Sequence, residues 1–314
     1  MSTSWVAGVV RAKALAGRRI GAGGARALAG SPGVAEAVTA LHLTPYGHDV
    51  RPGMGLAEAQ HAVGASLLWN MRVLAGWLPR RGADVVRLLA AGFEVANLDE
   101  HLSRLQGEPA DPAYSLGTLD TAWSRLSGTT TLAGAADVLA TASWRLRDAG
   151  TRRELQLGLR LAWADAVVAG VPAAAGWARS AAALLVVREA VLEGRRLSPP
   201  LARRASYVLG PAFVDAAAGG RTDVPVLRAR LPGDIRWTLE GIDGVGDLWR
   251  AEAGWWQRVE HDGFALLRGS SFDQRPVVGA LAVLAVDAWR TRAALEAAAR
   301  GGTLTVLEAF DGVA

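Results

Sequence analysis

The side chains that could carry out chemistry are scattered along this sequence rather than gathered in one motif. Its five histidines lie in separate segments, at His42, His48, His61, His101 and His261. Glu58 and His61 form one Glu-x-x-His step, but a carboxylate-bridged di-iron bundle needs two such steps and two further glutamates. We therefore expect His61 on a helix surface, and no metal-binding residue is predicted.

A glycine-rich stretch that begins at Gly21, GAGGARALAG, resembles a phosphate-binding loop in composition. It follows a predicted helix rather than a strand, and it lacks the Gly-Lys-Ser/Thr ending of a P-loop, so we expect a flexible connector. The sequence contains no His-Glu-x-x-His zinc motif, no Gly-x-Ser-x-Gly elbow and no Asp-rich pyrophosphate motif. Glu260-His261-Asp262 is a charged run without an identifiable third partner. No catalytic or cofactor-binding residue is predicted, and we expect a protein that is not an enzyme and has no small-molecule substrate.

Composition narrows the class further. With 51% hydrophobic residues in 314, the chain can bury large cores, and its alanine and leucine content favours helix. The absence of cysteine excludes disulfides and thiolate metal sites. A net charge of +4 is mild for this length, and Lys13 is the only lysine, so nucleic acid is not expected as a partner. The longest uncharged apolar stretches, 166–178 and 276–286, are shorter than the roughly 20 residues of a spanning helix, which predicts a soluble or peripheral protein.

A helical pattern that occurs twice organises the chain. Ser31 is a good N-cap, and Val34, Ala37, Val38 and Leu41 follow at helical spacing until Thr44-Pro45 ends the helix and Tyr46-Gly47 turns the chain. The same frame returns 98 positions later, where Trp144 stands in the place of Tyr46. A repeat of this length is the size of a domain, which indicates one helical unit used more than once.

The predicted helix over 83–106 has two distinct faces. Val85, Leu88, Leu89 and Ala96 form its apolar face, and Gly92 on the same face would let a neighbouring helix approach closely. The other side carries a polar stripe that consists of Arg87, Glu94, Asn97, His101 and Arg104. This stripe is either an ordinary solvated face or a polar wall that faces an internal groove or a partner.

Breaks rich in proline and glycine divide the sequence into three helical units, 1–108, 109–217 and 218–314. The segment around Glu94 resembles the one around Asp287 near the end of the third unit, whereas Ala181 stands near the matching position of the middle unit. The expected fold class is all-α, built from related helical units.

These residues also carry a family resemblance. A helix that ends in Thr44-Pro45-Tyr46-Gly47, followed by two long helices and then by Glu94 with Asn97-Leu98, resembles the C subunit of the V/A-type rotary ATPases. The eukaryotic relative of this family is called the d subunit. Arg11 in the N-terminal helix and a weaker echo at Asp287 add to the match. Family members commonly continue Asn-Leu with arginine, whereas Asp99 stands here.

The resemblance implies three pseudo-symmetric helical bundles arranged as a funnel. In that family the funnel sits on the cytoplasmic mouth of the proton-carrying, proteolipid c-ring and receives the central stalk, so it transmits torque without binding nucleotide. The implied partners are the c-ring and the central-stalk subunits, and the implied location is the cytoplasmic face of the membrane, as a peripheral subunit. On this basis the Arg87–Glu94–Asn97–His101 stripe is expected to line the cavity or to brace it against Arg11.

Two other classes remain open at this point. A helical adaptor or regulatory protein could keep the fold outside an ATPase, as Asp99 and the degenerate middle unit would permit. An all-helical enzyme with a hydrophobic pocket, such as an isoprenoid-handling one, is disfavoured by the missing acidic metal-binding motifs.

Overall fold

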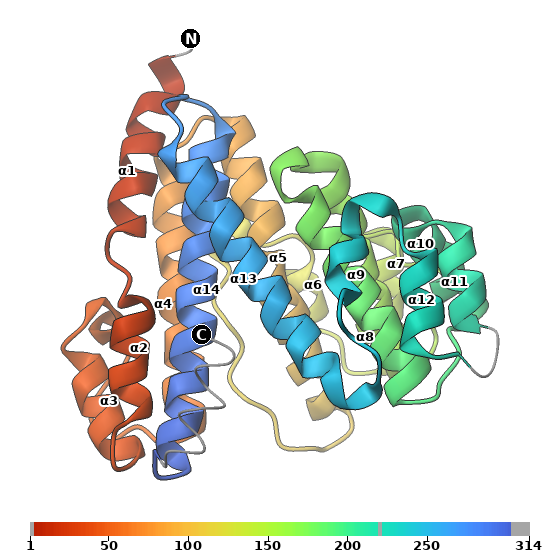
Figure 1. Cartoon of the computed structure of the whole chain (residues 1–314), viewed down its shortest axis with the longest axis horizontal. Helices are drawn as coiled ribbons and strands as arrows, with labels where there is room; N and C mark the ends of the chain where they lie inside the picture. The colour runs from red at the N-terminus through yellow and green to blue at the C-terminus, as the bar shows by residue number, and fades with distance from the viewer. Residues whose placement is uncertain (1–2, 219–221, 303–314) are drawn as a thin grey trace. The chain divides into compact units, whose positions relative to one another are not determined.

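The structure is a computed structural model that describes residues 3–218 and 222–302. In these residues the regular secondary structure consists of fourteen α-helices and short helical turns, and it contains no strand (Figure 1). The all-α fold class predicted from the sequence is therefore confirmed.

The chain divides into two compact units. The first, which we call the terminal unit, joins residues 1–86 to residues 256–314, and the central unit comprises residues 87–255. These units begin and end at other residues than the predicted units 1–108, 109–217 and 218–314, and the threefold division stays a prediction.

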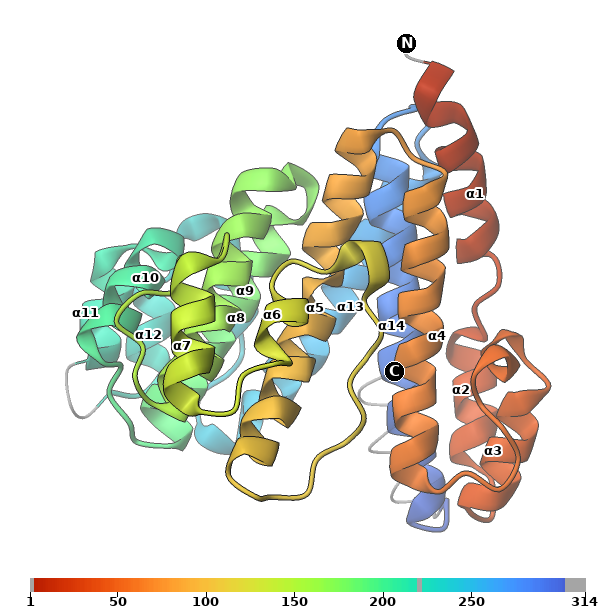
Figure 2. The same cartoon turned by 180° about the vertical axis from the view of Figure 1, so that it is seen from behind.

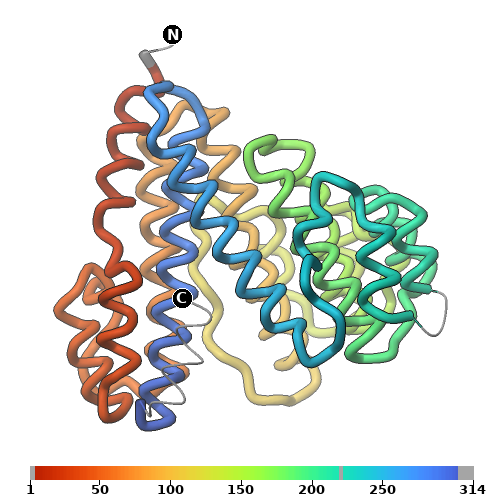
Figure 3. Tube along the Cα trace, in the orientation of Figure 1, coloured from red at the N-terminus to blue at the C-terminus, as the bar shows by residue number. Residues whose placement is uncertain are grey.

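The terminal unit is built around α14 (Gln274–Ala299), which is buried along most of its length. It packs against the helices that begin the chain, which Figures 1 and 2 show side by side with it. These are α1 (Val6–Ala16), α2 (Gly21–Ala29), α3 (Val34–His42) and α4 (Leu56–Gly76). The trace in Figure 3 shows α2 and α3 together beside the C-terminal half of α14. The first and last helices of the chain thus share one hydrophobic core.

Two further helices belong to the terminal unit only in part. They are the start of α5 (Arg80–Leu105) and the end of α13 (Leu248–Arg268). Glycines let α13 and α14 approach closely, since a Cβ atom on Gly279 would lie only 2.6 Å from the carbonyl oxygen of Gly263.

The central unit holds the rest of α5 and a series of shorter helices around two hydrophobic clusters. Its elements are α6 (Trp123–Leu126), α7 (Leu132–Thr141), α8 (Arg152–Gly170), α9 (Ala175–Val187), α10 (Pro199–Leu209), α11 (Pro211–Ala218) and α12 (Val224–Arg230). Gly92 of α5 lies where the ring of Trp163 on α8 leaves no room for a side chain, with 2.8 Å between the ring and a Cβ built there. Gly92 therefore makes room for an aromatic ring, and the close approach of a neighbouring helix stays a prediction.

One pattern of helix lengths occurs three times along the chain. A helix of 7 to 10 residues is followed by one of 19 to 21 residues and then by a third helix, which has 26 residues in the first and last series but 13 in the middle one. The three series are α3–α4–α5, α7–α8–α9 and α12–α13–α14.

Three local predictions were wrong. The glycine-rich stretch at Gly21 is not a connector but the helix α2, because the carboxylate of a distant helix accepts from the N–H groups that begin it. Ser31 does not cap α3, which begins at Val34 after an extended Gly33. The sequence pattern also predicts one helix over 171–195, but α9 begins only at Ala175, because Pro172 starts a separate 3-10 turn, and it is followed by a π-helical turn, Arg188–Leu192.

Candidate functional site: two buried carboxylates at helix starts

The carboxylate of Asp287 on α14 collects three hydrogen bonds in the interior of the terminal unit. Its Oδ1 accepts from the backbone N–H of Gly21 at 2.7 Å, and its Oδ2 accepts from that of Ile20 at 3.2 Å. Tyr46 donates its hydroxyl to the same Oδ2 at 2.9 Å. We call these four residues the Asp287 cluster. The first N–H groups of a helix have no partner inside the helix, so a carboxylate placed there stabilises α2.

Burial determines the ionisation of this cluster. It raises the pKa of Asp287, although the hydrogen bonds from Gly21, Tyr46 and Ile20 partly offset that effect. The pKa of the Tyr46 hydroxyl is raised well above its ordinary value, first by burial and then by the charge of Asp287. Tyr46 therefore remains a neutral donor at any physiological pH.

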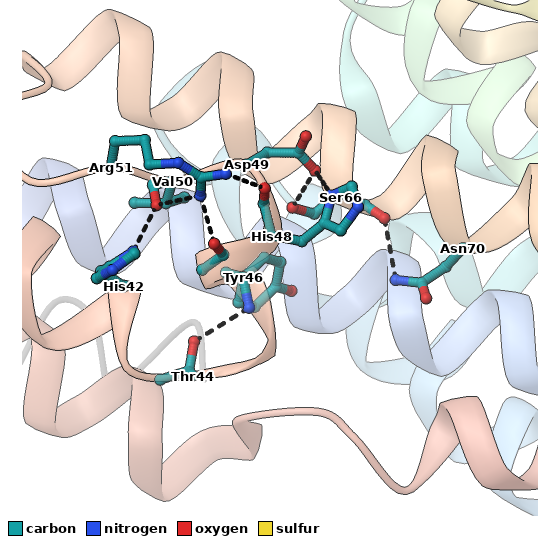
Figure 4. Close-up of polar contacts among 10 residues, drawn as sticks. His42, Thr44, Tyr46, His48, Asp49, Val50, Arg51, Ser66 and Asn70 are labelled. Atoms are coloured by element: carbon teal, nitrogen blue, oxygen red, sulfur yellow. Dashed lines mark hydrogen bonds and ion pairs between the residues drawn. The ribbon is translucent and has the colours of Figure 1, made fainter.

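The turn that presents Tyr46 is fixed by a dense set of local contacts (Figure 4). Tyr46 lies in the 3-10 turn Pro45–His48, where Thr44 Oγ1 accepts from the Tyr46 N–H at 3.2 Å. The guanidinium of Arg51 donates to three carbonyl oxygens, those of Gly47, His48 and Val50. This turn returns the chain over the end of α3, so the phenol ring points into the core.

Gly47 is required by the packing of this turn. A Cβ atom at this position would lie 2.0 Å from the carbonyl oxygen of His42, and backbone atoms cannot move aside as a flexible side chain can. The Tyr46-Gly47 pair singled out in the sequence is thus an aromatic donor followed by a residue that must lack a side chain.

A small cavity lies beside Tyr46 and Asp287, with a volume of about 70 Å³. Both hydrophobic and polar side chains line it, among them Arg19, Ser66, Trp69 and Asn70. Ser66 donates its hydroxyl to Asp49 Oδ2 at 2.7 Å, as Figure 4 shows. The cavity has room for a few water molecules, because one water needs roughly 10–15 Å³.

Glu94 on α5 makes the corresponding set of hydrogen bonds in the central unit. Its Oε2 accepts from the backbone N–H of Thr121 at 2.9 Å, and the N–H of Ala122 lies 3.1 Å from both carboxylate oxygens. Trp144 donates its indole N–H to Oε1 at 2.7 Å. These four residues form the Glu94 cluster. As at Asp287, an acid on a long helix accepts from two successive N–H groups close to the start of a helix, here α6, and from an aromatic side chain.

Burial also raises the pKa of Glu94, and the nearby charge of Asp120 acts in the same direction. The hydrogen bonds from Trp144, Thr121 and Ala122 lower it and partly offset the burial. Glu94 is only 1% exposed, so the carboxylate depends on these donors in place of water.

Asn97 and His101, one and two turns further along α5, are buried as well. Asn97 makes a reciprocal pair with Tyr114, in which its amide donates to the carbonyl oxygen at 2.9 Å and its Oδ1 accepts from the N–H at 2.7 Å. His101 Nε2 lies 2.8 Å from Thr129 Oγ1, and burial lowers the pKa of the imidazole. An ordinary solvated face is therefore wrong for Glu94, Asn97 and His101. Their hydrogen bonds run to the segment that follows α5, and an interface role for them stays a prediction.

Arg87 belongs to this stripe, and Arg11 is the residue predicted to brace it. Arg87 reaches the carbonyl oxygen of Thr118 at 3.4 Å from a half-buried position. Arg11 lies on α1 in the terminal unit, and its buried Nε has no hydrogen-bond partner among the described residues. The predicted brace between the stripe and Arg11 stays a prediction.

The middle series of helices holds a buried hydrogen bond between two hydroxyl groups. Ser180 on α9 and Thr238 in the turn Gly233–Leu239 are both buried, and the Thr238 hydroxyl donates to Ser180 Oγ at 2.8 Å.

Sequence reasoning missed Arg290, one turn beyond Asp287 on α14. Its guanidinium is buried and holds Glu260 through two parallel hydrogen bonds of 2.9 Å, which lower the pKa of Glu260. The signal was present in the sequence, because Asp287 and Arg290 are the only charges in the otherwise apolar run 276–291.

Each of the two buried carboxylates accepts hydrogen bonds from three donor groups. In residues 3–218 and 222–302 no group of three or more acidic and histidine side chains is placed to hold a metal ion. Over the same residues, none of the helices combines the length and the apolar character that a membrane crossing requires.

Comparison with models of known protein families finds none that matches this chain, and comparison with curated protein sequences finds no significant match.

Proposed function

We propose that this chain is a non-catalytic central-rotor subunit of a V/A-type ATPase/synthase, which links the membrane c-ring to the central stalk. The observation that carries the proposal is the cyclic order of the buried contacts. Tyr46 of the first helix series pairs with the acid of the last series, and Trp144 of the second series pairs with the acid of the first. Thr238 of the third series pairs with Ser180 of the second.

Such an order supports three related bundles in a closed arrangement, because each series then contacts the one before it and the first contacts the last. A funnel with approximate threefold pseudosymmetry has this connectivity. The recurrence of the helix series α3–α4–α5, α7–α8–α9 and α12–α13–α14 supports it as well.

Several residues that carry the family resemblance lie in the buried polar contacts of the two units. Tyr46, Glu94, Asn97 and Asp287 are buried, hydrogen-bonded residues, and Gly47 is fixed by packing. A torque-transmitting coupler needs a stiff body more than it needs a reactive group, and close-packed helices joined by satisfied buried polar groups provide stiffness. Proton transport would then be a property of the whole complex, in which this protein is a peripheral, cytoplasmic component.

The test is co-purification from native membranes. The tagged chain would be isolated in mild detergent and its companions identified by mass spectrometry, with an unrelated tagged helical protein as the control. We expect a proteolipid and central-stalk subunits in fixed proportion to the chain. Recovery alone, or with unrelated soluble proteins, would exclude the rotor function and leave the helical adaptor or regulatory protein as the explanation for the fold.

A further inference from the structure

Four helix ends meet at one end of the terminal unit. The start of α1, the end of α4, the start of α5 and the α13–α14 connection lie together there, at the top of Figures 1 and 2. Lys13 donates its Nζ to the carbonyl oxygen of Gly269 at 3.0 Å, which ties α1 to the α13–α14 connection. Gly8 of α1 packs directly on Leu78, and Gly82 of α5 packs on the ring of Trp5. These contacts make the four ends one continuous surface.

Large apolar side chains are exposed on this surface. Trp77 is 54% exposed at the end of α4, and Val6 and Phe272 are each 40% exposed. Val10, one turn along α1 from Val6, is 58% exposed. Aromatic side chains at helix ends are typical of proteins that meet the interfacial region of a bilayer, where the ring lies at the level of the headgroups.

The segments that carry these apolar residues are also rich in cationic side chains. Residues 5–13, 77–84 and 268–275 contain six Lys and Arg residues but only two Asp residues. One of those acids, Asp273, is engaged as the N-cap of α14, where it accepts from the N–H of Arg275 at 2.8 Å. These three segments therefore have a net charge of +4, which equals the net charge of the entire chain. We call this surface the basic-aromatic end, and its exposed apolar and basic members are Val6, Val10, Lys13, Trp77, Arg80, Arg81, Arg268, Phe272 and Arg275.

We propose that the basic-aromatic end binds directly to the surface of an anionic lipid bilayer. Exposed arginines are attracted to acidic headgroups, and the adjacent aromatic and aliphatic side chains can enter the interface. The apolar members distinguish this surface from a nucleic-acid site, which would need donors for phosphate but would gain nothing from Val6 or Phe272. The proposal concerns lipid rather than a protein partner, so it goes beyond the rotor function and does not depend on it.

The experiment is co-sedimentation of the purified full-length chain with vesicles. Vesicles of phosphatidylcholine alone are compared with vesicles that also contain phosphatidylserine, at low and at high salt. We expect binding to the anionic vesicles only, and its loss at high salt because salt screens the attraction. The double variant Arg80→Gln/Arg81→Gln is expected to bind about 25-fold more weakly, or about fivefold for each charge removed. Trp77→Ser is expected to lower binding roughly tenfold at unchanged net charge.

Matched control variants change the same residue types in the central unit. Arg230→Gln/Arg236→Gln removes two exposed arginines, and Trp249→Ser removes a tryptophan that is 47% exposed. Both controls should bind like the wild type. Each substituted side chain is exposed, and circular dichroism with a urea titration verifies that every variant is folded.

Several results would overturn the proposal. Absence of binding to anionic vesicles would do so, as would equal binding to both kinds of vesicle. So would losses in the control variants as large as those at the basic-aromatic end. The same variants would also be tested on double-stranded DNA. If DNA is bound as tightly as anionic vesicles and Trp77→Ser changes neither affinity, the surface is a general polyanion site rather than a lipid site.

Discussion

The Asp287 cluster and the Glu94 cluster contain the same hydrogen bonds between segments at very different distances along the chain. Asp287 contacts residues 241 to 267 positions away, whereas Glu94 contacts residues 27 to 50 positions away. The same set of hydrogen bonds therefore joins the two ends of the chain at Asp287 but joins neighbouring segments at Glu94. The difference indicates that these hydrogen bonds depend on the place of each residue within its helix series, and not on how far apart the residues lie in the sequence.

The two clusters also differ in their surroundings. A small cavity lies beside Asp287, and the charge of Arg19 lowers the pKa of this acid, whereas Asp120 raises that of Glu94. The aromatic donor is a phenol in one cluster and an indole in the other. If the clusters are equivalent, the same kind of substitution in each cluster should change the free energy of unfolding by a similar amount, except where the cavity or the neighbouring charges differ.

Removal of either acid should have the largest effect. Asp287→Ala and Glu94→Ala each leave three buried donors without an acceptor, and we expect each to lower the free energy of unfolding by about 4 kcal/mol. Urea denaturation monitored by circular dichroism measures both. Asp262→Ala is the control, because this carboxylate forms a partly exposed pair with Arg258 within α13 and should cost less than about 0.5 kcal/mol. If only one of the two substitutions lowered the free energy of unfolding by less than about 1 kcal/mol, the two clusters would not be equivalent.

The residue after each aromatic donor gives opposite predictions at the two clusters. Gly47→Ala places a Cβ against the carbonyl oxygen of His42 and should destabilise the protein by about 3 kcal/mol. At the corresponding position Arg145 has a left-handed backbone, with φ 46°, which a non-glycine residue adopts at a cost. Arg145→Gly should therefore stabilise by about 0.5–1 kcal/mol.

Chemical denaturation of both variants checks these signs, with Gly76→Ala as a control in which the new methyl group meets nothing within 4 Å. Equal signs at positions 47 and 145 would contradict the distinction between a packing requirement and a backbone requirement.

The hydroxyl of Tyr46 should contribute less than the carboxylate that it contacts. Tyr46→Phe removes one hydrogen bond to a charged acceptor and should cost about 1.5 kcal/mol. In the Asp287→Ala background the same substitution should cost almost nothing, because the two residues are coupled. A double-mutant cycle by urea titration measures the coupling. Tyr207→Phe serves as the control, since Tyr207 is 82% exposed.

The pH dependence should be the smallest and most diagnostic effect. Burial raises the pKa of Asp287 above its unfolded value near 4, so the folded protein binds the proton more tightly than the unfolded chain. Its contribution to stability is fully present below the unfolded pKa and is lost as the pH rises through the folded pKa. The wild type should therefore lose stability relative to Asp287→Asn as the pH increases from about 4.

Glu260 provides a control of opposite sign in the same unit. Arg290 lowers the pKa of Glu260, so its contribution is present above the unfolded pKa and is lost as the pH falls through the folded one. Relative to Glu260→Gln, the wild type should therefore gain stability as the pH rises. Urea titrations at several acidic pH values give the difference in unfolding free energy between the wild type and each variant, and its slope against pH. Slopes of the same sign for the two positions would show that burial does not control the pKa of Asp287 or that ion pairing does not control that of Glu260.

The sequence allowed part of this comparison to be predicted. Helical periodicity located α3 and α5, and the 98-residue repeat matched Tyr46 with Trp144, which both donate to a buried carboxylate. Spacing could not reveal which acid meets which aromatic side chain, because that choice depends on tertiary contacts between helices far apart in the chain. The helix at Gly21 was missed for the same reason, since glycine has low helix propensity and the stabilising carboxylate comes from residue 287.

The position of α14 has a consequence for how the protein is made. Ala25, Val38 and Leu41 are buried in one core with Ala294, Leu295 and Ala298, so the N-terminal helices cannot complete their core until the last helix has been synthesised. At the usual rate of translation, residues 1–86 wait about 10 to 40 s for it, whereas the central unit has all of its partners earlier. Newly made N-terminal helices therefore expose apolar surface on the ribosome for that interval, and this chain is expected to depend on a holding chaperone during its own synthesis.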